Sequence, residues 1–150
     1  MDPTRLAFST TRIMEILAAV ICDSAADYNG KLCVLGTFDT IYAHRFPAVH
    51  PHCALALRIV FRAADIGDHR FRVTFIDPDG HNVLPKEGEP RFEVKVTEIP
   101  EKAAFISRNF VINLQGLPLE KPSLFSFDVH MDEQIVARIP LQVIGAAAPA

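Results

Sequence analysis

Three histidines and a cysteine lie close together in the sequence and offer candidate ligands for a metal ion. His44 precedes the segment HPHC that begins at His50, and the four residues together supply three nitrogens and one sulfur. A cupin-like site would pair His50 and His52 with a glutamate a few residues later, but arginine is the only charged residue type between Cys53 and Arg62. We therefore predict that His50 and His52 are loop residues, that Cys53 is the first inward residue of a strand, and that no metal is bound here.

Two aspartates form a second candidate metal site. Asp77 and Asp79 lie in the sequence DPDG, and carboxylates of this kind can bind calcium. An EF-hand loop needs further oxygen ligands at set spacings ending in glutamate, and the sequence lacks them. Proline fixes φ at the second position and Gly80 accepts positive φ, so we predict an ordinary turn.

Nucleophile motifs and phosphate-binding loops are missing from the sequence. The serines do not occur in a G-x-S-x-G elbow, and the seven glycines stand singly, without a Walker or dinucleotide motif. Ser126, Asp128 and His130 share one face of a predicted strand, which we interpret as an exposed polar face. We therefore assign no catalytic residue and no cofactor, and the enzyme question stays open with a preference for a non-enzyme.

Four arginines are the candidate binding residues: Arg58, Arg62, Arg70 and Arg72. If the two strands that carry them form a hairpin, Arg62 lies opposite Arg70, and the other two lie nearby on the same surface. Like charges opposite each other destabilise a sheet unless an acid intervenes. One hypothesis is that Glu93 or another acid neutralises them. The other is that their guanidinium groups dock an acidic partner or an anion.

Apolar residues alternate with polar ones in several short segments, as in half-buried strands. The segments are residues 53–62, 69–77, 91–99, 107–115, 123–131 and 134–143. Turn residues separate the strands, at Asn29-Gly30, Asp79-Gly80 and Asp132-Glu133. With no convincing helix longer than a turn or two, the pattern predicts an all-β fold, an antiparallel β-sandwich of about eight to nine strands.

The segment from Ile13 to Cys22 is apolar on both alternating faces apart from Glu15. A strand here must be covered on both sides or lie at an interface, and a short helix is the competing prediction. Gly36 indicates a bulge or kink in a following strand, and Pro140 places the last strand at an edge or a bulge.

Composition limits the class of protein. The 150 residues fit one domain over residues 13–144, with an N-terminal extension over 1–12 and a flexible tail over 145–150. A formal net charge of -3 argues against general nucleic-acid binding, and the apolar run at 13–21 is too short to span a membrane. The cysteines Cys22, Cys33 and Cys53 are odd in number and lie in strand-like surroundings, so we expect reduced, buried thiols and a cytoplasmic location.

Several motifs resemble a known family. They are a strand ending in CD, the turn NGKL, the strand VLGTFDTIYA, the segment RFPAVHPHCALALRI, and the late segment LPLEKPSLFSFDVHMDEQIVARIPLQV. Between about Met14 and Val143 the chain is similar to short, uncharacterised bacterial proteins classed as a domain of unknown function. The resemblance implies a single cytoplasmic β domain and assigns no site residue.

Two functional hypotheses follow from the sequence. The first is a non-enzymatic module for protein binding or self-assembly, such as a homodimer, because the apolar first strand leaves surface for a partner or a second copy. The alternative is a small-molecule or metal-binding β domain, with or without catalytic activity, that has a pocket between its sheets and a covering loop that carries His44, His50 and His52.

Overall fold

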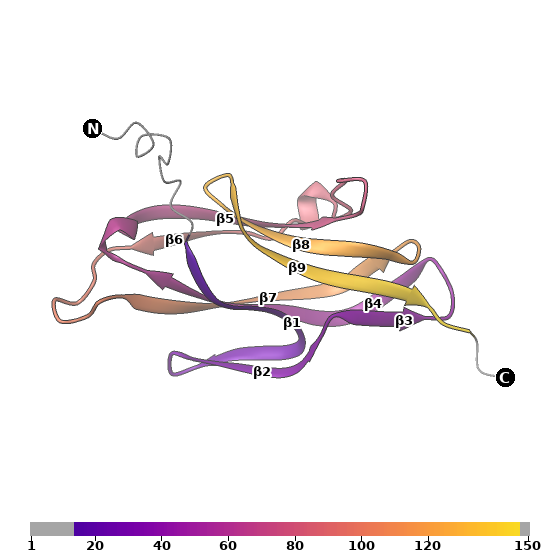
Figure 1. Cartoon of the computed structure of the whole chain (residues 1–150), viewed down its shortest axis with the longest axis horizontal. Coiled ribbons are helices and arrows are strands. Elements are labelled where there is room, and N and C mark those ends of the chain that lie inside the picture. Colours follow the sequence, from indigo (N-terminus) through magenta and orange to yellow (C-terminus); the bar gives the residue numbers. More distant parts are fainter. Residues whose placement is uncertain (1–13, 148–150) are drawn as a thin grey trace, which may run out of the picture.

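Nine strands make up most of the computed structural model, which describes residues 14–147 (Figure 1). The strands are β1 (Glu15–Tyr28), β2 (Lys31–Phe38), β3 (Thr40–Ala43), β4 (Ala48–Phe61), β5 (Gly67–Ile76), β6 (Arg91–Val96), β7 (Ile106–Leu119), β8 (Ser123–Met131) and β9 (Gln134–Gly145). Short 3-10 helices are η2 (Ala63–Asp65) and η3 (Lys86–Gly88). No helix within the described range has the length and apolar character needed to cross a membrane.

Two sheets form the molecule, a four-stranded sheet in the order β2-β1-β4-β7 and a five-stranded sheet in the order β3-β9-β8-β5-β6. Neighbouring strands are antiparallel except β3 and β9, which are parallel. The sheets face each other across an apolar interior, as in a sandwich. The predicted β-sandwich and its number of strands are confirmed.

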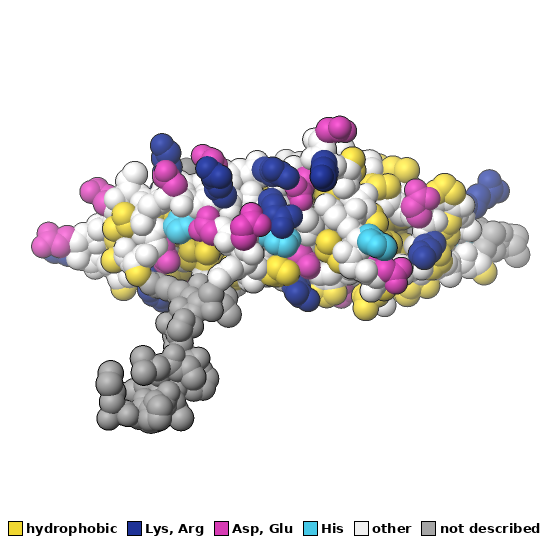
Figure 2. Space-filling view, turned by 90° about the horizontal axis from the view of Figure 1, so that it is seen from above, with side chains coloured by type: hydrophobic (Ala, Val, Ile, Leu, Met, Phe, Trp, Pro, Cys, Tyr) yellow, Lys and Arg dark blue, Asp and Glu magenta, His cyan; other side chains and the backbone are white. Residues whose placement is uncertain are grey.

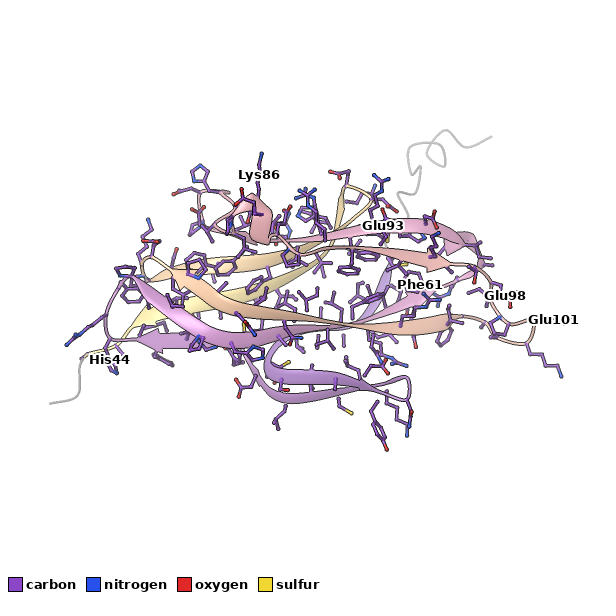
Figure 3. All side chains as sticks on the ribbon, turned by 180° about the vertical axis from the view of Figure 1, so that it is seen from behind. His44, Phe61, Lys86, Glu93, Glu98 and Glu101 are labelled. Atoms are coloured by element: carbon purple, nitrogen blue, oxygen red, sulfur yellow. The ribbon has the colours of Figure 1, made fainter. Side chains whose placement is uncertain are left out.

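Phenylalanines fill much of the space between the sheets. Phe61, labelled in Figure 3 between the two layers, is fully buried, and the ring of Phe75 stacks on Phe125 and Phe127 at centroid distances of 4.7 and 4.3 Å. These residues occupy alternate positions of their strands, so the neighbouring positions point away from the interior. That alternation positions the polar side chains on the outer face of the five-stranded sheet.

The predicted hairpin between residues 53–62 and 69–77 is wrong. β4 pairs with β1 and β7, whereas β5 pairs with β6 and β8 in the other sheet. At the end of β4, the backbone N–H of Arg62 donates to Asp65 Oδ2 at 2.7 Å, and η2 follows at once. The short polar connection therefore carries the chain across to the other sheet instead of closing a hairpin.

The first strand is covered on both faces only around Val20 and Cys22, where the cover comes from the chain itself, whereas Leu17 is 52% exposed. Figure 1 shows the second half of β1 turned back beneath the four-stranded sheet, where it forms a hairpin with β2. We call the stretch from Asp23 to Phe38 the hairpin layer. Between it and the sheet lies a small apolar cluster of Val20, Cys22, Ala25, Leu32, Ala54, Ala56 and Val111.

Most of the predicted turns are present. Asn29 and Gly30 have φ values of 50° and 79°, and Asp132 and Glu133 have φ values of 48° and 70°. Pro140 precedes the four residues of β9 that pair with β3, so the strand is locally at an edge there. Cys22 and Cys53 are buried free thiols, but Cys33 is exposed, because the outer face of the hairpin layer is open to solvent.

The domain boundaries fall partly outside the described residues. The predicted extension over 1–12 lies outside them, and so do residues 148–150 of the predicted tail. Within the described range, β9 continues to Gly145, and the backbone N–H of Ala146 donates to the carbonyl of Ala43 at 2.9 Å.

Candidate anion-binding groove

The outer face of the five-stranded sheet carries a hollow of about 350 Å³ lined by charged side chains. Arg70 and Arg72 come from β5, and Arg91 comes from the neighbouring β6. Glu93, His130 and Glu133 complete its polar lining. We call this hollow the arginine groove. Figure 2 looks onto the side of the molecule that carries it and shows basic, acidic and histidine side chains gathered across the middle of the surface.

Strand register explains how the three arginines meet. Phe71 and Val73 are buried, so the arginines on either side of Phe71 point outward. Arg72 lies directly opposite Arg91 on β6 and opposite His130 on β8, on its other side. Two guanidinium groups therefore face each other across neighbouring strands, an arrangement that is unfavourable without an acid between them.

Glu89 supplies that acid. Its carboxylate accepts hydrogen bonds from Arg91 Nε and Nη2 at 2.9 and 2.7 Å and from Arg72 Nη1 at 3.2 Å. The side chain of Glu89 is only 4% exposed, so these charge-assisted bonds are shielded from bulk water. Glu89 thus holds Arg72 and Arg91 side by side.

Two further acids contact the groove more loosely. Glu93 Oε1 lies 3.5 Å from Arg70 Nε, and Glu133 Oε2 lies 3.9 Å from Arg72 Nη2. Both carboxylates are largely exposed, and exposed ion pairs contribute little free energy because water and salt screen them. Glu93 thus lies beside Arg70, as one of the two hypotheses expected, but it forms only a loose, solvent-exposed pair with that arginine.

His130 lies at the side of the groove. Burial is the largest influence on its pKa, and the positive charge of Arg72 adds to it, so the pKa falls below the ordinary value of 6.5 despite nearby carboxylates. Its Nε2 atom lies 3.0 Å from Thr74 Oγ1. An anion bound beside Arg72 would favour the protonated ring and act against this lowering.

The polar face predicted for Ser126, Asp128 and His130 exists, but it is not an exposed face. Asp128 is buried and accepts a hydrogen bond from Ser126 Oγ at 2.6 Å, and the other two residues are half-buried. The arrangement does not form a nucleophile and base pair, because Ser126 donates to the carboxylate while His130 contacts Thr74.

The other two predicted arginines lie on β4 in the four-stranded sheet. Arg58 Nη1 donates to the carbonyl of Gly30 at 2.9 Å and to Asn109 Oδ1 at 2.7 Å, which ties the hairpin layer to the sheet. Arg62 Nη1 lies 2.6 Å from Glu15 Oε2, and its guanidinium lies over the ring of Phe105. The predicted set of four arginines is thus divided, and only Arg70 and Arg72 line the arginine groove.

The histidines of the first candidate metal site are separated. His50 and His52 belong to β4, so their predicted place in a loop is wrong. His50 packs on Phe38 and lines a surface hollow of about 440 Å³ beside Asp23, whereas His44 lies at one end of the molecule (Figure 3), with Nδ1 3.2 Å from the carbonyl oxygen of Ala146. Within residues 14–147, these histidines form no cluster that could hold a metal ion.

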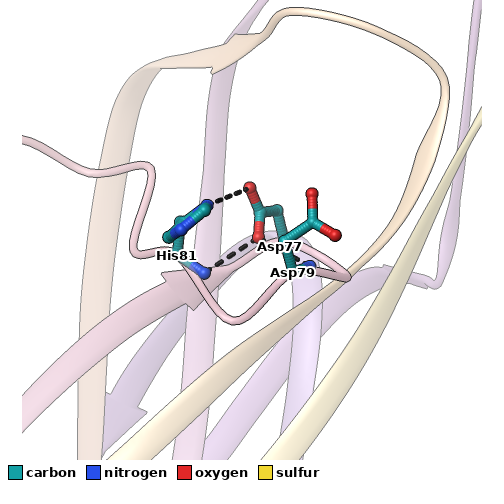
Figure 4. Close-up of side chains that lie close together, drawn as sticks. All are labelled: Asp77, Asp79 and His81. Carbon is teal, nitrogen blue, oxygen red and sulfur yellow. Dashed lines mark hydrogen bonds and ion pairs between the residues drawn. The ribbon is translucent and has the colours of Figure 1, made fainter.

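Asp77, Asp79 and His81 do bring three ligand atoms within 4.8 Å of one another (Figure 4). The predicted turn is confirmed there, because the backbone N–H of Gly80 donates to the carbonyl of Asp77 at 3.0 Å. Asp77 Oδ1 accepts the backbone N–H groups of Asp79 and His81, and these bonds lower the pKa of Asp77. The carboxylate of Asp77 already serves the turn, which accounts for the cluster without a metal.

Sequence reasoning missed Glu89, Arg91 and His130 as groove residues. Arg91 and His130 belong to strands with an alternating pattern, whereas Glu89 lies in the irregular segment before β6, and the groove depends on β6 and β8 lying on either side of β5. The local patterns of a single sequence do not specify that order of strands. The available signal was the alternation of inward and outward positions, since Arg91 and His130 fall on the polar face of their strands.

Comparisons with known proteins give a family and distant structural similarities. No curated protein matches the chain. The alkylpurine DNA glycosylase AlkC of Pseudomonas fluorescens, bound to DNA with an abasic site analog, aligns with a TM-score of 0.42 and 9% identity over 93% of this chain and 33% of its own. A glycosyl hydrolase family 2 member from Bacteroides cellulosilyticus aligns with a TM-score of 0.35 and 10% identity over 65% of this chain and 14% of its own.

Both structural similarities are too weak to indicate a shared activity, and this chain spans a third or less of those proteins. The family match is more extensive, because it covers residues 17–144 and so nearly all of the β-sandwich. It agrees with the resemblance seen in the sequence motifs. The chain belongs to the Family of unknown function (DUF6941).

Proposed function

We propose that this protein is a non-enzymatic binding module that docks an acidic segment of a protein partner in the arginine groove. The observation that carries the proposal is the pair Arg72 and Arg91, which face each other across two strands and are held together by the buried Glu89. Arg70 adds a third guanidinium to the same hollow. Guanidinium groups bind carboxylates in a planar, two-bonded geometry that lysine cannot reproduce.

An acidic segment suits this groove because two of the protein's own acids that contact the arginines are exposed, whereas the third, Glu89, is buried. Glu93 and Glu133 are exposed and weakly held, so incoming carboxylates can take their places at Arg70 and Arg72. Glu89 stays in position and keeps the arginines oriented before binding, which lowers the entropy cost of docking. The net charge of -3 for the whole chain argues against nucleic acid as the partner.

We also propose that the protein works in the reducing cytoplasm of a bacterial cell. Its three cysteines are free, and two of them are buried. Thiols in this state are typical of a reducing compartment. The bacterial source is supported by the resemblance of its motifs to short bacterial proteins.

Calorimetric titration with a hexaglutamate peptide tests the proposed function. Arg70→Ser and Arg72→Ser should each weaken binding roughly tenfold, because each removes a charge-assisted pair. Arg45→Ser is the matched control, since Arg45 is exposed on the β3–β4 connection and its loss changes the net charge equally. Circular dichroism establishes that each variant is folded. Arg70→Ser should fold normally, because the side chain of Arg70 is 84% exposed.

Equal weakening by Arg45→Ser and Arg72→Ser would contradict the proposal, since general charge attraction would then explain the binding. Inorganic phosphate and a single-stranded oligonucleotide serve as competing probes in the same titration. Tighter binding of the oligonucleotide than of the peptide would also overturn the proposed class of partner.

A further inference from the structure

A second surface hollow, of about 440 Å³, lies where the chain passes from the four-stranded sheet to the five-stranded sheet. Between β2 and β3, the backbone carbonyl of Asp39 accepts the N–H of Gln142 from β9 at 2.9 Å, which fixes this passage. The hollow is lined by the end of β2, by β3, by Asp23 of β1 and by His50 of β4. We call it the Asp23 hollow. It shares no residue with the arginine groove, so its ligand is independent of the acidic partner proposed above.

The carboxylate of Asp23 lies in this hollow without a counter-ion. Within residues 14–147, the Asp23 side chain makes no hydrogen bond and no ion pair. The residues that line the hollow include no lysine and no arginine. A second anion would therefore meet the charge of Asp23 with nothing to offset the repulsion, whereas a cation would be attracted.

Gly36 gives that carboxylate its place at the wall of the hollow. The backbone of Gly36 has a φ value of 69°, and a Cβ atom at this position would lie 2.5 Å from Asp23 Oδ2. Such an approach is shorter than any van der Waals contact between these atoms. The missing side chain on β2 thus leaves room for the Asp23 carboxylate to lie directly against the backbone of the neighbouring strand.

Aromatic rings form another part of the wall. Tyr42 on β3 is 67% exposed, and the half-buried ring of Phe38 packs on the His50 ring at a centroid distance of 5.7 Å. The face of an aromatic ring attracts positive charge, and a carboxylate neutralises it. Rings and an unpaired carboxylate in the same hollow are therefore suited to an organic cation.

We propose that the Asp23 hollow binds a primary alkylammonium group, with Asp23 as its counter-ion and with the rings of Tyr42 and Phe38 against its charge and its alkyl chain. A primary ammonium group carries three N–H donors. The hydroxyl of Thr37 and the ring of His50 line the same hollow and supply acceptor atoms besides the carboxylate. A quaternary ammonium group has no N–H donor and would leave these acceptors unused.

An NMR titration with n-butylammonium chloride tests the site. The amine should shift the backbone amide signals of Asp23, Phe38 and Tyr42, whereas n-butanol, which has the same carbon chain without the charge, should not. Asp23→Asn keeps the shape of the side chain and should weaken binding roughly tenfold, because it removes a charge-assisted contact. Asp68→Asn is the matched control, since Asp68 is an exposed acid on β5 and its loss changes the net charge equally.

Tyr42→Leu tests the contribution of the ring. The variant keeps an apolar side chain at an exposed position, so the fold should be unaffected, and binding should weaken about two- to fivefold. The blocked tripeptide Gly-Lys-Gly in the same titration identifies the source of the ammonium group: tighter binding than n-butylammonium assigns the site to a lysine side chain of a protein, and weaker binding assigns it to a free amine.

Three results would overturn the proposal. The first is the absence of shifts at about 50 mM n-butylammonium. The second is n-butanol binding as tightly as the amine, since the hollow would then select apolar chains and not charge. The third is equal affinity of the natural chain and Asp23→Asn, which would mean that the carboxylate does not act as the counter-ion.

Discussion

Glu89 is the residue on which the geometry of the arginine groove depends. Its buried carboxylate joins Arg72 and Arg91, which otherwise oppose each other across β5 and β6. Glu89→Gln removes the negative charge but keeps the shape of the side chain. We expect this variant to lose about 1 kcal/mol of unfolding free energy, measured by urea denaturation, because a shielded charge-assisted contact is lost.

Glu93→Gln is the matched control for that experiment. It removes the same charge from an exposed pair with Arg70 at 3.5 Å, and exposed pairs contribute little. The control should therefore change the unfolding free energy by less than about 0.5 kcal/mol. Equal losses in the two variants would mean that Glu89 has no special role.

His69 forms an ion pair that makes stability depend on pH. Burial alone would lower the pKa of His69, but the hydrogen bond to the Asp65 carbonyl at 2.6 Å, together with the hydrogen bond and charge of Asp132, raises it above the ordinary value of 6.5. A raised pKa in the folded state means that the ion pair stabilises fully at acidic pH. This contribution is lost as the pH rises through the raised value.

Replacing His69 with glutamine should reveal that dependence. The natural chain should exceed His69→Gln in unfolding free energy by more at about pH 5.5 than at about pH 8.5. His81→Gln serves as the control, because its ring is exposed and lies 3.6 Å from Asp77. If the difference in unfolding free energy between His69→Gln and the natural chain stays constant with pH, the ion pair does not contribute to stability.

At the level of single residues, the sequence predicted part of the candidate site. Arg70 and Arg72 were selected because period-two alternation is a local property of a strand. Arg58 was also selected, but its side chain serves the hairpin layer, a contact that depends on the sharp bend in β1. Glu89 lies in an irregular segment between strands, where no periodic pattern indicates its direction.

Among the elements, the hairpin layer has only a small apolar contact with the rest of the fold. A few small side chains hold it to the four-stranded sheet, and polar contacts from Arg58 and Asn109 secure its tip at Gly30 and Asp27. The hairpin layer should therefore open more readily than the strands of the main core.

Arg58→Leu should increase that opening. The variant loses two hydrogen bonds to the hairpin tip and the sheet, so amide hydrogen exchange in residues 24–38 should accelerate roughly tenfold. Exchange in the central strands β5 and β8 should stay unchanged. Arg62→Leu on the same strand is the control, because Arg62 contacts Glu15 instead of the hairpin layer; equal acceleration by both variants would contradict this role.

The strands were predictable because alternation and turn residues act over short distances, but their partners were not. Asn29-Gly30 and Asp132-Glu133 adopt the positive φ that tight hairpin turns need. The connection from Arg62 to Gly67 has similar polar residues, yet Asp65 turns it towards the other sheet. A hairpin turn and a crossing connection of this length have the same composition, so the sequence did not distinguish them.

For the whole molecule, the arginine groove and the hairpin layer lie on different sides of the β-sandwich. The arginine groove is on the outer face of the five-stranded sheet, and β2 is in the hairpin layer beneath the four-stranded sheet (Figure 1).

Binding of an acidic segment in the arginine groove is tested most directly by the pKa of His130, measured by NMR with and without hexaglutamate. Burial and the charge of Arg72 lower this pKa in the free protein, and carboxylates bound at Arg72 should raise it. Binding in the arginine groove should shift the His130 titration upward, an effect that Arg72→Ser greatly reduces, and the peptide should bind more tightly as the pH falls. A His130 titration unchanged by saturating peptide would contradict binding in the arginine groove.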